Sequence, residues 1–199
     1  AKFAADIQLP GLLHARILRP PSHGAKLITA NVSEAEKIKG IRVVRDGDLI
    51  AVLSEDRDKA DQAIVKVKAE YSFDEIKVDD KTIFDRILKA DLTANVVRSN
   101  GNTETGRKIS DTVIESEFHN SYVAHAPIEP HAATAMIEGD KITVWVSTQA
   151  PFPAQETISR EMKVPLEKVR IITPFVGGGF GGKSPHRQAV EAVKLAKIT

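Results

Sequence analysis

The stretch "IITPFVGGGFGGKSPHRQAVEAVKLAKIT" (residues 171–199) joins a strand-like run to a helix-like run through five glycines in six positions. From Gly177 to Ser184 it fits the phosphate-loop pattern G-x-x-x-x-G-K-[ST]. Through Gly177, Gly179 and Gly182 it also fits the dinucleotide pattern G-x-G-x-x-G. A glycine turn that lets two backbones pack closely is a third interpretation. The residues around the loop help to distinguish these interpretations.

The surroundings of the loop argue against both nucleotide-binding interpretations. In a phosphate-loop protein a downstream strand carries an Asp that holds Mg²⁺, but residues 185–199 all read as one helix. Pro185 fixes the first helical turn and removes one N–H group near the expected phosphate. A dinucleotide site needs an acidic residue about 20 positions beyond the glycines, and the sequence stops before that position. Close packing and contact with a ligand both stay open, because glycine serves both.

The composition is that of a globular protein without features of a nucleic-acid or membrane protein. Of the 199 residues, 42% are hydrophobic and 28% are charged, which suits one ordinary domain or two small ones. The 28 basic and 27 acidic residues are interspersed and give a net charge of +1, so we expect no nucleic-acid partner. No run of about 18 apolar residues predicts a membrane span. No signal-peptide core is visible, which leaves a cytoplasmic or a periplasmic location open.

Two features of the sequence bear on metal binding. Cysteine is absent, which excludes disulfides, zinc-thiolate sites and iron–sulfur clusters held by the residues of this chain. The stretch "HAPIEPH" places His125, Glu129 and His131 close together, and these residue types suit Zn or Fe. Pro127 and Pro130 rule out a helix there, so these side chains cannot lie on one helix face as metal-binding His pairs at positions i and i+4 do. We therefore expect no metal ion ligated by the protein.

Residues 1–78 predict a small α+β unit. Apolar residues at alternating positions indicate strands, and apolar residues at helical spacing indicate helices. We expect strands over 11–19, 41–47 and 48–55, and helices over 33–40, with Ser33 as the N-cap, and 56–71. Pro20 and Pro21 must end the first strand, and Asp46 and Gly47 form the turn between the other two.

The rest of the sequence predicts a linker and a second, strand-rich part. Residues 79–110 hold one plausible short helix and a polar stretch rich in Asn, Thr and Gly, which is typical of a linker. From there on we expect strands over 111–121, 131–137, 141–149 and 169–176, and helices over 152–164 and 185–199. The second and third of these strands should form a hairpin through Glu138, Gly139 and Asp140.

Three segments in close succession resemble one protein family. They are Ala124–Ala135 ("AHAPIEPHAATA"), Val144–Gln155 ("VWVSTQAPFPAQ") and Val169–Lys183 ("VRIITPFVGGGFGGK"). Together they resemble the molybdopterin-binding subunit of the molybdenum hydroxylases, the xanthine dehydrogenase and aldehyde oxidase family. "AHAPIEP" and the N-terminal "RPPSHGAKL" are most similar to the isoquinoline 1-oxidoreductase beta-subunit branch. The resemblance rests on the combination of segments, since the glycine loop alone is a weak signal.

The resemblance implies an α+β fold with two domains. Residues 1–78 correspond to the family's α/β hammerhead domain, 79–110 to a linker, and 111–199 to the first part of its mixed α+β molybdopterin-binding domain. In the family the catalytic glutamate and several further cofactor contacts lie beyond the position of Thr199. We therefore expect the chain to be a fragment or a truncated subunit that is inactive by itself.

The resemblance also assigns residues to a site. Gln149 in "STQAP" matches the glutamine that hydrogen-bonds an oxygen on molybdenum, a role that suits an uncharged amide donor. Phe180 and Gly181 match loop residues beside the metal centre, where backbone N–H groups face the cofactor. Gly178 and Gly179 match positions at which the loop approaches the pterin and its phosphate. Molybdenum is held by the pterin in this family, so no residue of the chain is expected to ligate it.

Two residues at the end of the loop stay outside this set. Lys183 reads as a structural or a solvated cation, as most lysines are. Ser184 stands where xanthine-oxidising members carry a glutamate. Xanthine is therefore a poor candidate substrate, which agrees with the isoquinoline-like branch.

The resemblance implies hydroxylation of an electron-poor carbon in an N-heterocycle or an aldehyde, with oxygen taken from water. The implied cofactor is molybdopterin carrying Mo, its cytosine dinucleotide form included. Because the chain has no cysteine, the iron–sulfur clusters that accept the electrons belong to a partner subunit in this interpretation, and the remainder of the molybdopterin subunit is a second partner. A non-catalytic fragment or assembly module is the alternative, and a phosphate-loop nucleotide-binding protein is a weaker one.

Overall fold

The computed structural model describes residues 2–73, 78–90 and 95–199. The chain divides into two units, a larger one formed by Ala1–Asp74 together with His125–Thr199 and a smaller one formed by Glu75–Ala124. The larger unit holds all the strands found in the described residues, and it also holds the glycine loop.

The N-terminal part of the larger unit contains two small antiparallel sheets. Their strands are β1 (His14–Ile17), β4 (Leu49–Ser54) and β3 (Arg42–Asp46), in that order, in the first sheet, and β2 (Lys26–Asn31) and β5 (Lys68–Ser72) in the second. The helical elements are the 3-10 turn η1 (Ala4–Asp6), α1 (Ser33–Glu36) and α2 (Arg57–Ile64). Asp56 determines where α2 begins, because its carboxylate accepts hydrogen bonds from the N–H groups of Asp58 and Lys59 at 2.9 and 3.3 Å.

Strand β4 carries the core of this part because both of its faces are buried. Ile50 and Val52 lie on one face and pack with residues of α2. Ala51 and Leu53 alternate to the other face, where they pack with Leu195 from the C-terminal helix. The central position of β4 in its sheet explains why its sequence is a continuous apolar run.

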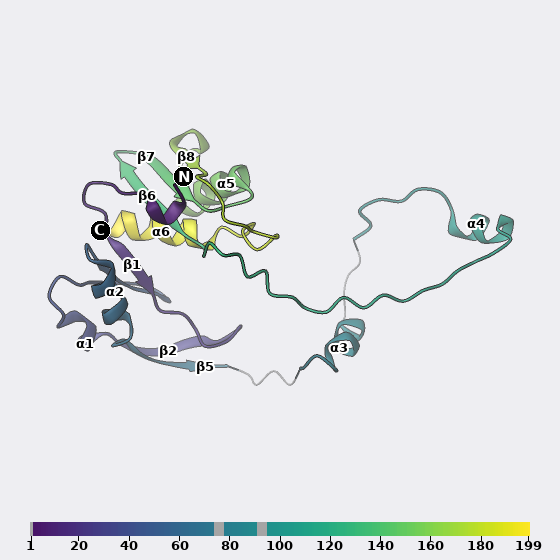
Figure 1. Cartoon of the computed structure of the whole chain (residues 1–199), viewed down its shortest axis with the longest axis horizontal. Coiled ribbons are helices and arrows are strands. Elements are labelled where there is room, and N and C mark those ends of the chain that lie inside the picture. The colour runs from purple at the N-terminus through teal and green to yellow at the C-terminus, as the bar shows by residue number, and fades with distance from the viewer. Residues whose placement is uncertain (1, 74–77, 91–94) are drawn as a thin grey trace. The chain divides into compact units, whose positions relative to one another are not determined.

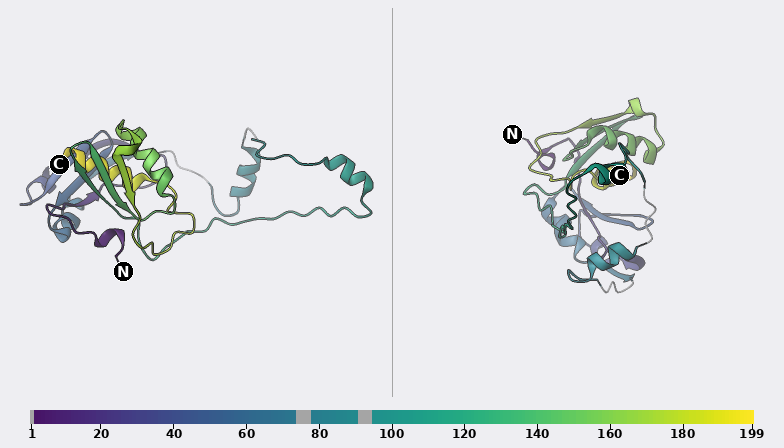
Figure 2. Two further views of the ribbon diagram at one scale, coloured as in Figure 1. Left: turned by 90° about the horizontal axis from the view of Figure 1, so that it is seen from above. Right: turned by 90° about the vertical axis from the view of Figure 1, so that its right-hand side faces the viewer.

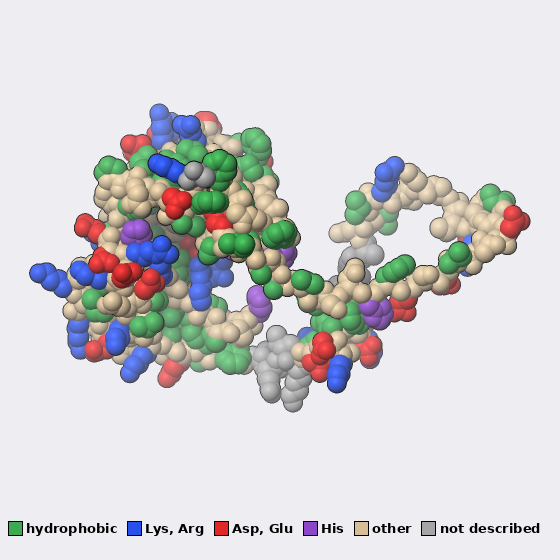
Figure 3. All heavy atoms as spheres, viewed as in Figure 1, with side chains coloured by type: hydrophobic (Ala, Val, Ile, Leu, Met, Phe, Trp, Pro, Cys, Tyr) green, Lys and Arg blue, Asp and Glu red, His purple; other side chains and the backbone are tan. Residues whose placement is uncertain are grey.

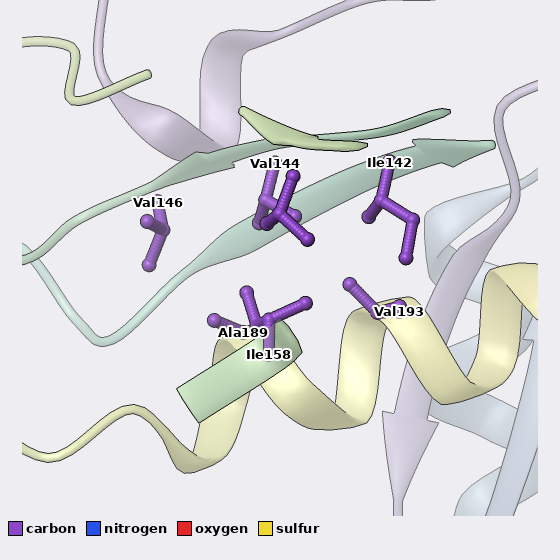
Figure 4. Packing of buried hydrophobic residues seen from close by; sticks show 7 residues of the cluster. Ile142, Val144, Val146, Ile158, Ala189 and Val193 are labelled. Atoms are coloured by element: carbon purple, nitrogen blue, oxygen red, sulfur yellow. The ribbon is translucent and has the colours of Figure 1, made fainter. Parts of the chain in front are cut away.

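The C-terminal part of the larger unit contains a third sheet and two longer helices. The strands, in sheet order, are β6 (Ala133–Glu138), β7 (Lys141–Val146) and β8 (Val169–Ile172), and the helical elements are α5 (Pro151–Met162), the 3-10 turn η2 (Leu166–Lys168) and α6 (Arg187–Ile198). Strands β6 and β7 form an antiparallel hairpin, whereas β7 and β8 are parallel and need the crossover that α5 provides. Figure 4 shows the apolar side chains of β7 packed with Ile158 of α5 and with Ala189 and Val193 of α6.

Helix α6 joins the two parts of the larger unit. Ala189 and Val193 are buried in the core of the third sheet, and Leu195 is buried against strands β3 and β4 of the first. Figure 1 shows α6 between these sheets, and Figure 2 shows it from two further directions. An ion pair reinforces the join, because Nη1 and Nη2 of Arg19 donate to the Glu191 carboxylate at 2.5 and 2.6 Å.

The smaller unit contains the short helices α3 (Ile83–Lys89) and α4 (Thr103–Ile109), and no other helix or strand in its described residues. Many of its apolar side chains are exposed, among them Ile114 and Phe118 at 84% and 87%. Figure 3 shows hydrophobic side chains spread along the surface of this unit. In the parts of the chain that the structure describes, the helices are too short or too polar to cross a lipid bilayer.

Three predictions of local structure are wrong. Residues 111–121 form no strand, because among the described residues no second strand pairs with them and their apolar side chains stay largely exposed. The helix predicted over 56–71 gives way at residues 68–72 to strand β5, which pairs with β2. Ser33 is the first residue of α1 rather than its N-cap, which is Val32.

Candidate functional site

Three segments that are separated in the sequence by other elements meet at one edge of the third sheet. Strands β7 and β8 are parallel, so the residues that follow them, 147–150 and 173–183, leave the sheet at the same edge. Strand β6 is antiparallel to β7, with Ala133 paired to Val146, so residues 125–132 enter β6 from that edge as well. The topology therefore brings together the segments on which the family resemblance rests.

The side chain of Gln149 is held by the backbone of the glycine loop. Its Oε1 accepts hydrogen bonds from the N–H groups of Gly181 at 3.0 Å and Lys183 at 3.3 Å. The Gln149 backbone N–H donates to the Lys183 carbonyl oxygen at 3.2 Å. With the amide oxygen fixed in this way, Nε2 has no acceptor among the described residues, and Gln149 is exposed. The geometry leaves an uncharged amide donor accessible to a ligand.

The glycines of the dinucleotide pattern make room for side chains of this chain. Gly179 is buried beneath the Gln149 amide, and an added Cβ there would lie 2.5 Å from Gln149 Cδ, which is closer than real contacts allow. The same close approach pairs Gly177 with Glu129, at 2.6 Å from Cβ to Cβ, and Gly182 with His125, at 3.0 Å to Cγ. Packing within the protein thus accounts for the G-x-G-x-x-G spacing.

A buried ion pair links the two ends of the glycine loop. Lys183 is fully buried, and its Nζ donates to Glu129 Oε2 at 2.6 Å. The same oxygen accepts hydrogen bonds from the Gly177 N–H and the Ser147 hydroxyl, both at 2.8 Å. The Glu129 N–H donates to the Gly177 carbonyl oxygen at 3.2 Å. One glutamate therefore fixes both the first and the last residue of the loop.

The ion pair keeps the Glu129 carboxylate charged in spite of its burial. Burial acts to raise the pKa of Glu129, but hydrogen bonds from Lys183, Gly177 and Ser147 outweigh it, so that the pKa lies below its usual value. Of the two roles predicted for Lys183, the structural cation is therefore confirmed, and the solvated cation is wrong. Because its Nζ is bonded to Glu129, Lys183 is not free to reach a phosphate.

The potential metal ligands of "HAPIEPH" have separate surroundings. Glu129 binds Lys183, His125 packs on Gly182, and His131 is exposed. Among the described residues, no group of three His, Asp or Glu side chains could hold a metal ion. The role of Glu129 as an anchor of the loop was missed by the sequence analysis, which considered it only as a metal ligand.

The glycine loop presents an exposed aromatic residue on strained backbone. Phe180 has a φ of 53°, and the residue is 73% exposed. A left-handed conformation at a non-glycine residue costs about 1–3 kcal/mol, and such strain gathers at functional sites. The Phe180 N–H has no partner among the described residues, whereas the Gly181 N–H is bonded to Gln149. The Phe180 N–H is thus a second accessible donor.

The donors and acceptors at this edge fit a polar, multidentate group such as molybdopterin. Gln149 Nε2 and the Phe180 N–H are uncharged donors that suit the oxygen and nitrogen acceptors of a pterin. Two buried polar atoms, Glu129 Oε1 and His186 Nδ1, also lack a partner in the described parts of the chain. Burial lowers the pKa of His186, which favours its neutral form. Unpartnered buried polar groups of this kind are rare in native proteins.

Comparisons with known proteins show which family the chain is similar to. A family model described as molybdopterin cofactor-binding domain matches residues 88–199. A probable xanthine dehydrogenase subunit of Bacillus subtilis (strain 168) is 27% identical over 219 residues, which cover 92% of this chain and 29% of that protein. The nicotinate dehydrogenase large molybdopterin subunit of Eubacterium barkeri is 28% identical over 222 residues, which cover 92% and 51%. The crystal structure of quinoline 2-oxidoreductase from Pseudomonas putida 86 matches with a TM-score of 0.70 at 21% identity, over 98% of this chain and 31% of that one.

The chain has a mixed α+β fold, which matches part of the quinoline 2-oxidoreductase structure. The chain belongs to the molybdopterin cofactor-binding domain family of the molybdenum hydroxylases. It spans 29% and 51% of the length of the two relatives from B. subtilis and E. barkeri.

Proposed function

We propose that this chain forms one wall of the cofactor site in a molybdenum hydroxylase, which hydroxylates an electron-poor carbon of an N-heterocycle or an aldehyde with oxygen from water. The family match over residues 88–199 supports the cofactor. The observation that carries the proposal is the orientation of Gln149, whose amide oxygen is held by two backbone N–H groups so that its Nε2 donor is accessible.

In this proposal the chain binds and orients the cofactor. Molybdopterin, when bound, supplies the redox and oxygen-transfer chemistry. Gln149 Nε2 donates a hydrogen bond to the cofactor without adding a charge, and its position is set before binding, so that little reorganisation is needed. The Phe180 N–H is a second donor, and the Phe180 ring covers an edge of the site. Gly178, Gly179 and Gly181 complete the loop that lies against the cofactor, with Gly179 making room for Gln149.

The proposal extends to domains, partners and substrate. Residues 1–78 form an α/β hammerhead domain, 79–110 a linker, and 111–199 the first part of the molybdopterin-binding domain. Because the chain has no cysteine, the electrons pass to iron–sulfur clusters on a partner subunit, and the remainder of the molybdopterin subunit is the second partner. Relatives named for nicotinate and quinoline favour an isoquinoline-like N-heterocycle as the substrate.

Replacement of Gln149 tests the proposal. In the assembled holoenzyme, Gln149→Ala removes a donor from the cofactor site without emptying the core, because Gln149 is exposed. One such preorganised donor is worth about 2.7–4 kcal/mol in comparable sites, so we expect turnover to fall by up to about 100- to 1,000-fold. Gln62→Ala, on the exposed side of α2, is the matched control and should keep full turnover. Turnover of Gln149→Ala within about twofold of the wild type would refute the proposal.

A further inference from the structure

The proposed function uses Gln149 and the glycine loop but gives no role to the ion pair beside them. The Lys183 side chain is 0% exposed and the Glu129 side chain 8% exposed. A buried ion pair is weak evidence for stability, because apolar residues of similar volume often serve as well or better. The hydrogen bonds around the pair indicate another role.

The backbone of Lys183 is bonded to the segment that carries Gln149. The Lys183 N–H donates to Gln149 Oε1 at 3.3 Å, and the Lys183 carbonyl oxygen accepts from the Gln149 N–H at 3.2 Å. The same carbonyl oxygen accepts from the Thr148 hydroxyl at 3.1 Å, and that hydroxyl accepts from the Ala150 N–H at 3.0 Å. A displacement of Lys183 would therefore break the bonds that orient the Gln149 amide.

The side chain of the same lysine is fixed to the third sheet through Glu129. Glu129 Oε2 binds Lys183 Nζ, the hydroxyl of Ser147 directly after β7, and the N–H of Gly177 at the start of the loop. The end of a sheet strand is thus connected to both ends of the loop through one carboxylate. A charged hydrogen bond of 2.6 Å is directional, so it fixes the position of the loop end more closely than apolar packing would.

We propose that Glu129 and Lys183 are positioning residues, which hold the end of the glycine loop where the Gln149 amide is turned toward the cofactor. The pair touches neither cofactor nor substrate and acts through Gln149. The inference rests on the proposed function for the identity of the ligand. The coupling between the ion pair and Gln149, in contrast, is a property of this chain and can be measured without cofactor.

The test is an NMR and hydrogen-exchange study of the 199-residue chain without cofactor. The local readouts are the exchange rate of the Gly181 N–H, which is bonded to Gln149, and the through-space contact between the Gln149 side chain and the Gly179 α-protons. The global readout is the denaturant midpoint of unfolding. The variants are Lys183→Met, Glu129→Gln and the double variant.

If the pair has a positioning role, the variants should affect the local readouts and the denaturant midpoint differently. Lys183→Met leaves a carboxylate buried without its cation and should lower the midpoint, whereas the double variant has neither charge and should recover most of it. In Lys183→Met and in the double variant we expect the Gly181 N–H to exchange at least about tenfold faster than in the wild type, and the contact between Gln149 and Gly179 to weaken. If Lys183→Met does not fold, the Gly181 exchange rate of the double variant tests the proposal by itself.

Two outcomes would overturn the proposal. One is a double variant in which Gly181 exchange returns to the wild-type rate together with the midpoint, because the pair then only stabilises the fold. The other is unchanged Gly181 exchange in a folded Lys183→Met.

The exposed pair Lys168 and Asp140, whose atoms lie 2.8 Å apart, supplies the matched control. Lys168→Met with Asp140→Asn should leave the loop readouts unchanged. The proposed function and the positioning role can be refuted independently. Full turnover of Gln149→Ala in the holoenzyme would contradict the proposed function, but it would not change the NMR result.

Discussion

Removal of Arg19 should loosen the join between the two parts of the larger unit. Arg19 makes two hydrogen bonds, at 2.5 and 2.6 Å, to Glu191 of α6, whose side chain is only 10% exposed. Arg187, four residues earlier in the same helix, binds the same carboxylate at 2.8 Å. After Arg19→Ala, Glu191 keeps Arg187 as its remaining ion-pair partner.

The expected cost lies between the values for buried and for exposed ion pairs. Breaking a buried pair costs about 3–5 kcal/mol, and an exposed pair is worth about 0.2–1 kcal/mol. Because Arg19 is 47% exposed and Arg187 stays in place, we expect a loss of about 1.5–2.5 kcal/mol. At about 2–4 °C per kcal/mol for a chain of this size, the thermal midpoint should fall by about 3–10 °C. Arg187→Ala is the matched control and should cost about 0.3–0.5 kcal/mol, because its side chain is 67% exposed.

The pH dependence of the Arg19→Ala effect checks its cause. Burial acts to raise the pKa of Glu191, but hydrogen bonds from Arg19 and Arg187 outweigh it, so the pKa lies below the ordinary value of 4.5. A pKa that is depressed in the folded state gives stability that is complete above the ordinary pKa and is lost as the pH falls through the folded-state pKa. Thermal scans should therefore show a smaller difference between the wild type and Arg19→Ala at about pH 3 than at about pH 7. A loss below about 0.5 kcal/mol at neutral pH, or one that does not shrink in acid, would refute the reasoning.

The geometry of the loop supports three further predictions. Mg²⁺-ATP should not bind, because Lys183 is buried and paired with Glu129; a micromolar, Mg²⁺-dependent complex in calorimetry would contradict this. Phe180→Gly should not lower the free energy of unfolding by more than about 1 kcal/mol, because the residue is 73% exposed and the substitution relieves backbone strain. In the assembled enzyme the same variant should retain less molybdenum than the wild type, as metal analysis can measure. The isolated 199-residue chain should hold little molybdenum and oxidise no N-heterocycle. Contacts on one side of the cofactor must by themselves offset the several kcal/mol that the cofactor loses in translational and rotational freedom on binding. Stoichiometric molybdenum in the purified chain would count against this.

The elements nearest the site could be predicted because their signals are local. Turn residues around Gly139, between runs of apolar residues, predicted the hairpin that β6 and β7 form. The helix predicted over 152–164 is confirmed as α5, which begins at Pro151, where a missing N–H is tolerated. The final helix is confirmed as α6, and its apolar residues at helical spacing are those buried in the third sheet's core.

Pairing between distant segments could not be predicted in the same way. Residues 65–72 ("VKVKAEYS") alternate apolar and polar positions, but the helical spacing of the preceding residues concealed this strand signal. Strand β5 forms because it pairs with β2, which is separated from it in the sequence by two helices and two other strands. Residues 111–121 are the opposite case. Their two faces alternate along the sequence as in a strand, but they have no partner strand among the described residues. Alternation predicts a strand only where a neighbour is present.

In the site, the sequence identified candidate residues but not the bonds between them. Gln149 was singled out by resemblance, and the structure adds that Gly181 and Lys183 hold its amide oxygen. Glu129 entered as a candidate metal ligand, and its ion pair with Lys183 was missed. The two residues are 54 positions apart, and no local pattern marks a buried ion pair.

The two nucleotide-binding patterns in the loop have a common physical origin. Each pattern requires glycines because the backbone must approach another group closely, and phosphate is only one such group. Here the close neighbours are side chains of the same chain, with Gly177 against Glu129 and Gly179 against Gln149. The lysine distinguishes the cases, because in a phosphate loop it faces the ligand, whereas Lys183 turns inward to a carboxylate. The loop therefore offers a ligand neutral N–H donors and no cation of its own.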